Sequence, residues 1–292
     1  MRLLVTGATG QLGSELARKL TGLGHEVFAP DPDDLDLLDP VRVAATIREQ
    51  RWDWVINCAA YTAVDKAESA AEQAFVINRD CPGEMARSVA GYGGRMLQVS
   101  TDFIFSGDQR CPYTETDIPK PLGVYGRSKL EGEQVVLEML PDATVLRTAW
   151  VYGVYGHNFV KTMLRVAAEG RPLRVVNDQM GTPTWTADIV MAIVALVEQQ
   201  AGGTYHFTAA GQASWYGFAS AILEDAARIG FPVNTDAVVP ILTSEYPTPA
   251  RRPAYSVLDT RKIEPLLPSP PPEWRDSLNN MLKELATCAD CL

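Results

Sequence analysis

The chain has 292 residues and a formal net charge of −10, because 26 Lys and Arg side chains are outnumbered by 36 Asp and Glu side chains. Binding to a nucleic-acid backbone requires clustered cations, and no basic run in this chain is longer than a pair such as Arg251-Arg252. With 46% hydrophobic and 21% charged residues, the composition is that of a globular protein and excludes an intrinsically disordered one. We therefore expect no nucleic-acid partner.

The hydrophobic segments also argue against a membrane protein. The longest apolar run covers residues 189–197, well short of the roughly 20 residues that a helix needs to cross the hydrocarbon layer. The N-terminus runs from a short apolar stretch directly into glycines and lacks the long apolar stretch of a signal peptide. We expect a cytoplasmic protein with no membrane partner.

The five cysteines are odd in number and mostly scattered, at Cys58, Cys81, Cys111, Cys288 and Cys291. This pattern is not that of a disulfide framework, and it predicts reduced thiols. Cys288 and Cys291 have the spacing of half a zinc site. No second pair and no nearby histidine completes it, so we interpret these residues as part of a solvated tail.

The first half of the chain alternates strand-like and helix-like segments. Short β-rich runs occur at residues 2–6, 26–29, 54–58, 95–100 and 144–148. Between them, apolar residues recur with helical spacing, for example at Leu12, Leu16 and Leu20 and again within residues 41–49 and 85–90. This alternation predicts an α/β fold, a Rossmann-type doubly wound parallel sheet, with residues 1–150 forming a dinucleotide-binding domain.

The composition changes after Trp150, where helical patterns are separated by connections rich in proline and glycine. Helices are predicted at residues 159–168, 189–197 and 274–285. Residues 151–292 are thus expected to form a smaller α/β substrate-binding domain. Strand-like stretches at residues 173–176 and 204–208 are expected to rejoin the first sheet, so that the two domains interleave within residues 173–208.

A glycine-rich loop directly follows the first predicted strand and opens the first predicted helix, with glycines at Gly7, Gly10 and Gly13. Residues without Cβ allow a tight turn and let the N–H groups of the helix start approach a pyrophosphate closely. The loop predicts a dinucleotide site that includes Gln11 and Leu12. The alternative is a merely structural turn. The spacing Gly-x-x-Gly-x-x-Gly is typical of short-chain dehydrogenase/reductases.

Further cofactor contacts are expected where later strands end. Asp31 stands eighteen residues after Gly13, at the end of the second strand, where a carboxylate binds the adenosine ribose hydroxyls and repels a 2′-phosphate. Asp31 therefore favours NADH, unless it only begins a turn-forming acidic run. Asp36 and Leu37 are expected near the adenine. The stretch after the third strand is expected to border the nicotinamide, unless it is an ordinary turn, and contains Ala60, Tyr61 and Thr62.

Tyr125 and Lys129 are four residues apart, on one face of a predicted helix. A nearby ammonium group favours a phenolate, which tunes a tyrosine for acid–base catalysis, and a lysine also donates to the nicotinamide ribose. Thr101 lies at the carboxyl end of the preceding strand, the edge at which such sheets bind ligands. The three residues predict a catalytic site, and the alternative for the Tyr-Lys pair is a solvated helix face.

Together these motifs resemble the extended short-chain dehydrogenase/reductases and, within them, the dTDP-4-dehydrorhamnose reductase family. The similarity extends over almost the whole chain and is carried by residues 7–13, 59–68, 100–105, 125–129, 147–152, 158–163, 177–183 and 246–253. The last three stretches are more selective than the generic motifs. The resemblance implies reduction of the C4 ketone of dTDP-4-dehydro-β-L-rhamnose by NADPH or NADH, the final step of dTDP-L-rhamnose synthesis.

The resemblance also implies roles for single residues. Tyr125 would donate the proton to the ketone oxygen, Lys129 would lower the pKa of Tyr125 and hold the ribose, and Thr101 would hydrogen-bond the reacting oxygen. The predicted substrate contacts beyond these are Asp102 and Trp150 for the sugar and Asn177 and Arg252 for the diphosphate. Core packing remains the alternative for Trp150, and a surface charge remains the alternative for Arg252.

Related activities differ at identifiable positions. Sugar-nucleotide 4,6-dehydratases carry an acidic residue where this chain has Phe103, which argues against dehydration. Some family members are magnesium-bridged homodimers. Glu15 matches one of their acidic positions, but Ala187 stands where a second carboxylate is expected, so we assign no metal ligand. Two different functions are also compatible with the sequence: a cofactor-binding regulatory subunit similar to the β subunit of methionine adenosyltransferase, and a reductase or epimerase of another nucleotide sugar.

Overall fold

The structure is a computed structural model that describes residues 1–288, and its centre is a six-stranded sheet with every neighbouring pair of strands parallel. The strand order is β10-β5-β4-β3-β1-β2, so the direction of winding reverses between β1 and β3. The strands are β1 (Arg2–Thr6), β2 (Glu26–Phe28), β3 (Trp54–Asn57), β4 (Arg95–Thr101), β5 (Thr144–Thr148) and β10 (Gly203–His206).

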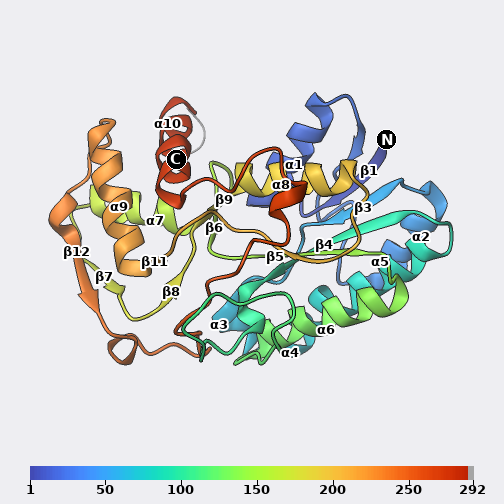
Figure 1. The fold of residues 1–292 in the computed structure, drawn as a ribbon, viewed down its shortest axis with the longest axis horizontal. Coiled ribbons are helices and arrows are strands. Elements are labelled where there is room, and N and C mark those ends of the chain that lie inside the picture. Colours follow the sequence, from blue (N-terminus) through green and yellow to red (C-terminus); the bar gives the residue numbers. More distant parts are fainter. Residues whose placement is uncertain (289–292) are drawn as a thin grey trace.

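Helices cover both faces of this sheet (Figure 1). Leu12, Leu16 and Leu20 of α1 lie one turn apart, are all buried, and pack with α8 against one face. The opposite face is covered by α2, α5 and α6. The helices concerned are α1 (Gln11–Gly22), α2 (Pro40–Gln50), α5 (Cys81–Ala90), α6 (Val124–Met139) and α8 (Thr186–Glu198). The predicted doubly wound α/β fold is confirmed.

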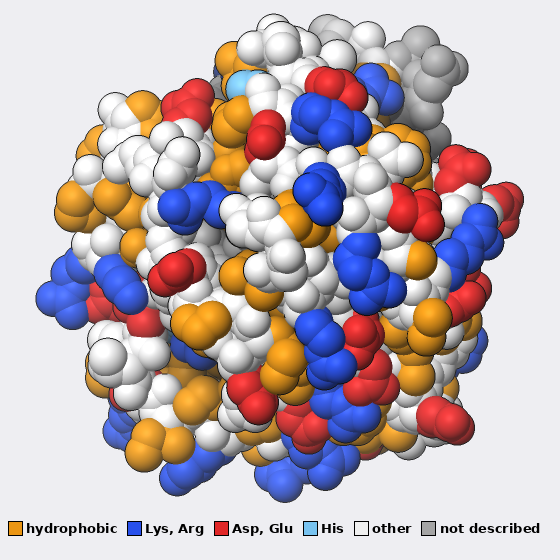
Figure 2. Space-filling model, turned by 90° about the vertical axis from the view of Figure 1, so that its right-hand side faces the viewer, with side chains coloured by type: hydrophobic (Ala, Val, Ile, Leu, Met, Phe, Trp, Pro, Cys, Tyr) orange, Lys and Arg blue, Asp and Glu red, His pale blue; other side chains and the backbone are white. Residues whose placement is uncertain are grey.

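Two short helices, α3 (Val64–Ala67) and α4 (Ala71–Phe75), follow β3, and α4 continues through a π-helical turn at Val76–Asp80 into α5. Within residues 1–288, no helix combines the length and the apolar character needed to cross a membrane. On the face shown in Figure 2, acidic and basic side chains are interspersed. This mixture differs from the basic surface with which proteins bind nucleic-acid backbones.

The two strand-like stretches after residue 170 pair with different partners. Residues 203–206 form β10, which pairs with β5 at the edge of the central sheet. The expectation for residues 173–176 was wrong, because β7 (Leu173–Val176) pairs with β12 (Val238–Ile241) in a separate two-stranded sheet. The reason is packing: Leu173 and Val175 are buried in the core of the smaller region, away from the central sheet.

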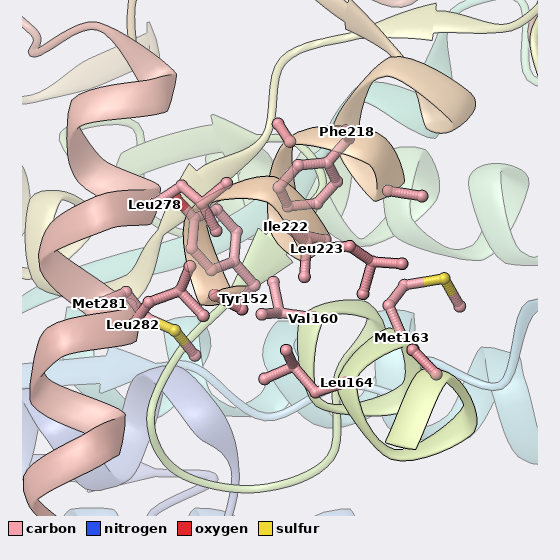
Figure 3. Packing of buried hydrophobic residues seen from close by; sticks show 14 of the residues in the cluster. Tyr152, Val160, Met163, Leu164, Phe218, Ile222, Leu223, Leu278, Met281 and Leu282 are labelled. Carbon is pink, nitrogen blue, oxygen red and sulfur yellow. The ribbon is translucent and has the colours of Figure 1, made fainter. Parts of the chain in front are cut away.

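The smaller region has its own core, built mainly from α7, α9 and α10 (Figure 3). Figure 3 shows Tyr152 pointing into this core toward the side chains of Phe218 and Leu278. The three helices are α7 (Phe159–Ala168), α9 (Trp215–Arg228) and α10 (Trp274–Thr287). The region also contains the short strands β6 (Val151–Tyr152), β8 (Met180–Gly181), β9 (Thr184–Trp185) and β11 (Ala213–Ser214). A domain division near residue 150 remains our proposal.

Candidate active site

The carboxyl ends of the central parallel strands border a pocket of about 890 Å³, at the edge where such sheets bind ligands. Sixteen of the predicted site residues line it, and Asn177 and Tyr61 do not. Those lining the pocket are Gly7, Gly10, Gln11, Leu12, Gly13, Asp31, Asp36, Leu37, Ala60, Thr62, Thr101, Asp102, Tyr125, Lys129, Trp150 and Arg252.

The glycine loop is packed so tightly that no side chain fits at Gly7 or Gly13. Gly7 has φ of +72°, and a Cβ on it would lie 2.8 Å from the Ala59 nitrogen. A Cβ on Gly13 would lie 2.2 Å from the carbonyl oxygen of Gly7. Gly10, the N-cap of α1, offers no side chain to cap the helix, so the first N–H groups remain available to an anion in the pocket.

Asp31 forms the turn that the sequence left open as an alternative to ribose binding, and it also lies at the pocket. It lines the pocket, and its Oδ1 also accepts hydrogen bonds from the N–H groups of Asp33 (2.9 Å) and Asp34 (3.0 Å). Asp36 is similar, because it lines the pocket while its Oδ1 accepts from the N–H of Leu38 at 2.9 Å. Each carboxylate thus shapes its own loop and faces the pocket.

Four buried polar atoms of residues lining this pocket have no hydrogen-bond partner among the described residues. They are Gln11 Oε1 at the start of α1, Ser100 Oγ at the end of β4, Asp102 Oδ2 just after β4 and Thr148 Oγ1 at the end of β5. A buried polar group without a partner is costly, and a ligand with polar groups removes that cost. Together with the tight glycine loop, these atoms fit a bound dinucleotide.

Tyr61 lies beside the pocket and is not part of its lining. Its N–H donates to Asn78 Oδ1 at 2.8 Å, and its ring packs in a small cluster with Ala67, Ala74 and Val124. Tyr61 thus has a packing role in the free protein, whereas its neighbours Ala60 and Thr62 line the pocket. The alternation follows from side chains pointing in different directions along an extended segment.

Tyr125 and Lys129 lie on consecutive turns of α6, and Thr101 is the last residue of β4. Thr101 lies close enough to Tyr125 to act on the pKa of its phenol, which it lowers. Burial nevertheless raises the pKa of Tyr125 to about 12, so the side chain is a protonated phenol at neutral pH. The expectation of a lowered Tyr125 pKa is therefore wrong for the free protein, because loss of water outweighs the effect of the neighbours.

Lys129 is buried, and its Nζ donates to the carbonyl oxygen of Val99 on β4 at 2.7 Å. Burial lowers the pKa of Lys129 to about 8, which leaves most of the ammonium charged at neutral pH. A hydrogen-bonded and desolvated ammonium is held in place and has little freedom to rotate away. The solvated helix face considered for this pair is excluded by the burial of Lys129.

Asp102 and Phe103 follow Thr101 in a 3₁₀ turn at Asp102–Ile104. Asp102 is 2% exposed, and its Oδ1 accepts a hydrogen bond from Thr101 Oγ1 at 3.1 Å. Burial raises the pKa of Asp102 to about 6. Phe103 meets the ring of Tyr125 edge-on, with ring centroids 5.6 Å apart. The pocket is thus apolar at the position where a dehydratase needs an acidic group.

Aromatic side chains from both regions meet at the pocket. Trp150, just after β5, has φ of +45°, a left-handed backbone conformation that is uncommon outside glycine. Its ring stacks on Trp215, the first residue of α9, and both side chains line the pocket. Trp215 was missed by sequence reasoning, because only the tertiary structure brings the start of α9 to the ends of the central strands.

Arg252 lines the pocket and is held in an ion pair. Its guanidinium donates to both carboxylate oxygens of Asp65, at 3.2 Å and 2.8 Å, and the pair is partly exposed. This Arg252 hydrogen bond lowers the pKa of Asp65. Asn177 lies elsewhere: it is exposed after β7, and its Oδ1 accepts from Ser214 Oγ at 2.6 Å. The structure therefore does not bring Asn177 to the site, because β7 belongs to the separate sheet.

Glu15 does not form a metal site with its neighbours. Its carboxylate accepts a hydrogen bond from Thr186, and burial raises the pKa of Glu15 to about 6. Ala187 offers no ligand, and residues 1–288 contain no group of three or more His, Cys, Asp and Glu side chains placed to hold a metal ion. The residues present thus do not fit a magnesium site within one chain, and we derive no step from one.

The cysteines are only partly as expected. Cys58, Cys81 and Cys111 are free thiols, and burial raises the pKa of Cys58 to about 12. Cys288, however, is disulfide-bonded, so the expectation of a reduced thiol was wrong at this position. Cys291, the second cysteine of the predicted tail, lies outside the described residues.

The class of protein follows from the two ends of the pocket. One end offers uncapped helix N–H groups for a dinucleotide, and the other holds a phenol, an ammonium and a hydroxyl for proton transfer to a carbonyl. Such a site belongs to an NAD(P)-dependent oxidoreductase. A family model described as "RmlD substrate binding domain" matches residues 1–287, and the chain belongs to this family.

Individual relatives are similar to this chain over nearly their full length. The dTDP-4-dehydrorhamnose reductase of Burkholderia thailandensis is 42% identical, over 98% of this chain and 99% of that protein. A probable dTDP-4,6-dihydroxy-2-methyloxan-3-one 4-ketoreductase of Streptomyces antibioticus is 41% identical, over 98% and 96%. The solved dTDP-4-dehydrorhamnose reductase of Bacillus anthracis in complex with NADP is 36% identical, with a TM-score of 0.91 over 97% of this chain and 99% of that chain.

Proposed function

We propose that this protein reduces the C4 ketone of dTDP-4-dehydro-β-L-rhamnose to the alcohol of dTDP-L-rhamnose, using NADPH or NADH. The observation that carries the proposal is the gathering of Thr101, Tyr125 and Lys129 in one pocket with the glycine loop. The similarity to dTDP-4-dehydrorhamnose reductases supports the choice of substrate. A regulatory subunit without turnover would not need this complete set of proton-transfer groups.

The nicotinamide, when bound, supplies a hydride to the ketone carbon. The chain supplies the proton, because the phenol of Tyr125 is protonated at neutral pH and lines the pocket together with Thr101. Thr101 Oγ1 and the Tyr125 hydroxyl bind the ketone oxygen and favour the growth of negative charge on it. Lys129 holds the nicotinamide ribose and adds a positive charge beside the phenol.

The remaining lining residues position the two ligands. Gly7, Gly10 and Gly13 leave room for the pyrophosphate, and Asp31 contacts the adenosine ribose and favours NADH. On the substrate side, Asp102 and the stacked tryptophans enclose the sugar, while Arg252 binds the diphosphate. We further propose that the protein is cytoplasmic and forms a homodimer. Sedimentation of the purified chain would test the oligomeric state.

A second candidate is reduction of another dTDP-linked keto sugar. The 41% identity to the Streptomyces antibioticus ketoreductase favours it, because that protein is named for a different sugar. The two candidates share the cofactor site and the proton donor, and they differ only in the sugar that the pocket accepts.

The test is oxidation of NADPH and of NADH, followed by nicotinamide absorbance, with dTDP-4-dehydrorhamnose generated in situ from dTDP-glucose by the upstream dehydratase and epimerase. We expect turnover that Tyr125→Phe lowers by roughly 10²-fold or more, with cofactor affinity nearly unchanged. Turnover of another dTDP-keto sugar alone would favour the second candidate. Tight cofactor binding without turnover of any keto sugar would refute both.

A further inference from the structure

A buried ion pair lies one helical turn beyond Lys129. Glu133, four residues further along α6, accepts hydrogen bonds from Arg147 on β5, at 3.1 Å from Nε and 2.7 Å from Nη2. The side chains of Arg147 and Glu133 are only 7% and 3% exposed. Burying two charges is expensive, and the reaction proposed above makes no use of this pair.

His206 of β10 completes the surroundings of Arg147. Its Nδ1 lies 3.0 Å from the carbonyl oxygen of Tyr113, which can only accept, so Nδ1 carries the proton. Its Nε2 therefore accepts from Arg147 Nη1, at 3.2 Å. Burial lowers the pKa of His206 to about 3, so the ring is neutral. Arg147 is thus fixed between a neutral acceptor and the carboxylate of Glu133.

Within residues 1–288, the groups that act on Lys129 include one negatively charged side chain. Tyr125 on α6 and Cys58 after β3 are both neutral at pH 7, since burial raises the pKa of each to about 12. The backbone acceptor of Lys129, the carbonyl of Val99 on β4, carries no net charge. Glu133, ion-paired with Arg147, is the carboxylate whose charge opposes the loss of the Lys129 proton. Asp102, after β4, acts on Tyr125.

The spacing of the two side chains suits this role. Residues four apart on a helix are neighbours, with Cβ atoms roughly 6 Å apart, so their charges interact strongly when water is excluded. Arg147 holds the carboxylate through two nitrogen atoms, which fixes its position between α6 and β5. The strand register supports the arrangement, because Arg147 is paired with Ser100, next to the Val99 carbonyl that accepts from Lys129.

We propose that Glu133, clamped by Arg147, is a positioning residue that keeps the buried Lys129 ammonium charged at the pH at which the enzyme works. The proposal rests on the proposed function, because it assigns Lys129 to cofactor binding and catalysis. The pair does not touch the substrate. It acts through Lys129, and its removal leaves the glycine loop and Tyr125 in place.

The first measurement is NADPH affinity as a function of pH, followed by fluorescence, in the full-length protein. In Glu133→Gln, which preserves shape and removes the charge, we expect the pH at which affinity falls on the alkaline side to move down by about one unit. The matched control is Glu131→Gln on the same helix, whose partner Arg79 is partly exposed. Its profile should coincide with that of the unchanged protein. A Glu133→Gln profile that also coincides would overturn the proposal.

Glu133→Gln leaves the buried Arg147 charge without its partner and could therefore misfold. A second variant separates the proposed effect from misfolding. Glu133→Leu combined with Arg147→Met removes both charges, and the alkaline fall should again occur at lower pH. Glu133→Asp, which keeps the charge, should restore most of the original profile. An unshifted double variant, or equal effects of the Gln and Asp variants, would show that the pair serves only folding.

Turnover separates this inference from the proposed function. If the unchanged protein reduces dTDP-4-dehydrorhamnose, the alkaline limb of its kcat should move in Glu133→Gln in the same direction as the affinity profile. If the unchanged protein turns over no keto sugar, the proposed function fails, and the NADPH affinity profiles still decide the role of Glu133.

Discussion

The rings of Trp150 and Trp215 stack face to face, with centroids 3.6 Å apart and planes within 8°. The contact joins the end of the central sheet to the first residue of α9, and it closes one wall of the pocket. Gly181 lies directly against the Trp150 ring, so that a Cβ there would come within 2.4 Å of it. The aromatic wall therefore depends on the absence of a side chain at Gly181.

Gly181→Ala should displace the Trp150 ring, because a rigid indole cannot yield by rotating a flexible end. We expect roughly tenfold lower kcat/KM for the nucleotide sugar and a weaker near-ultraviolet circular dichroism signal from the stacked pair. Gly22→Ala is the matched control, since a Cβ there meets nothing within 4 Å. An unchanged spectrum in Gly181→Ala would contradict this account of the wall.

Asp31→Asn should shift cofactor preference toward NADPH. The amide oxygen can still accept from the N–H groups of Asp33 and Asp34, so the turn is kept while the negative charge is lost. Loss of repulsion toward the 2′-phosphate should raise the NADPH/NADH ratio of kcat/KM by roughly tenfold. Steady-state kinetics with both cofactors measures this ratio. A ratio equal to that of the unchanged protein would leave Asp31 with its turn-forming role alone.

Asp102→Asn should stabilise the protein at neutral pH while impairing turnover. The folded pKa of about 6 lies above the ordinary value of 3.8, so the folded state binds the proton more tightly and loses stability as pH rises through this window. An amide avoids that loss. The gain should be small near pH 4 and reach about 3 kcal/mol above pH 7.

Urea unfolding at several pH values measures this difference for Asp102→Asn. Asp142→Asn, at an exposed position before β5, is the control and should give a gain near zero throughout. A stabilisation of Asp102→Asn that did not depend on pH would argue against burial of an ionised carboxylate at this site.

Arg252→Ala should raise the KM for the nucleotide sugar by roughly tenfold and leave the KM for NADPH unchanged, because a guanidinium suits a diphosphate. The neighbouring Arg251 is exposed and does not line the pocket, so Arg251→Ala serves as the control. Initial rates at varied substrate concentration give both constants. Equal KM values for the two variants would show that Arg252 does not bind the nucleotide sugar and serves only in its ion pair with Asp65.

The sequence determined by itself those features that depend on neighbours along the chain. The glycine loop after β1 and the helix that buries Leu12, Leu16 and Leu20 could be predicted, because turn geometry and helical periodicity are local properties. The spacing of Tyr125 and Lys129 predicted a shared helix face for the same reason. Parallel strands end at one edge of a sheet, which is why the predicted residues that follow β1 to β5 line one pocket.

Only the tertiary structure decided the features that depend on burial and on contacts between distant segments. The pairing of β7 with β12, the stacking of Trp215 on Trp150 and the ion pair of Arg147 with Glu133 all join residues far apart in the chain. The raised pKa of Tyr125 likewise has no sequence signal, since it results from exclusion of water by the completed fold. The types of side chain at the site could therefore be predicted from the sequence. Their pKa values and ion pairs could not, because these depend on which side chains the folded structure buries and brings together.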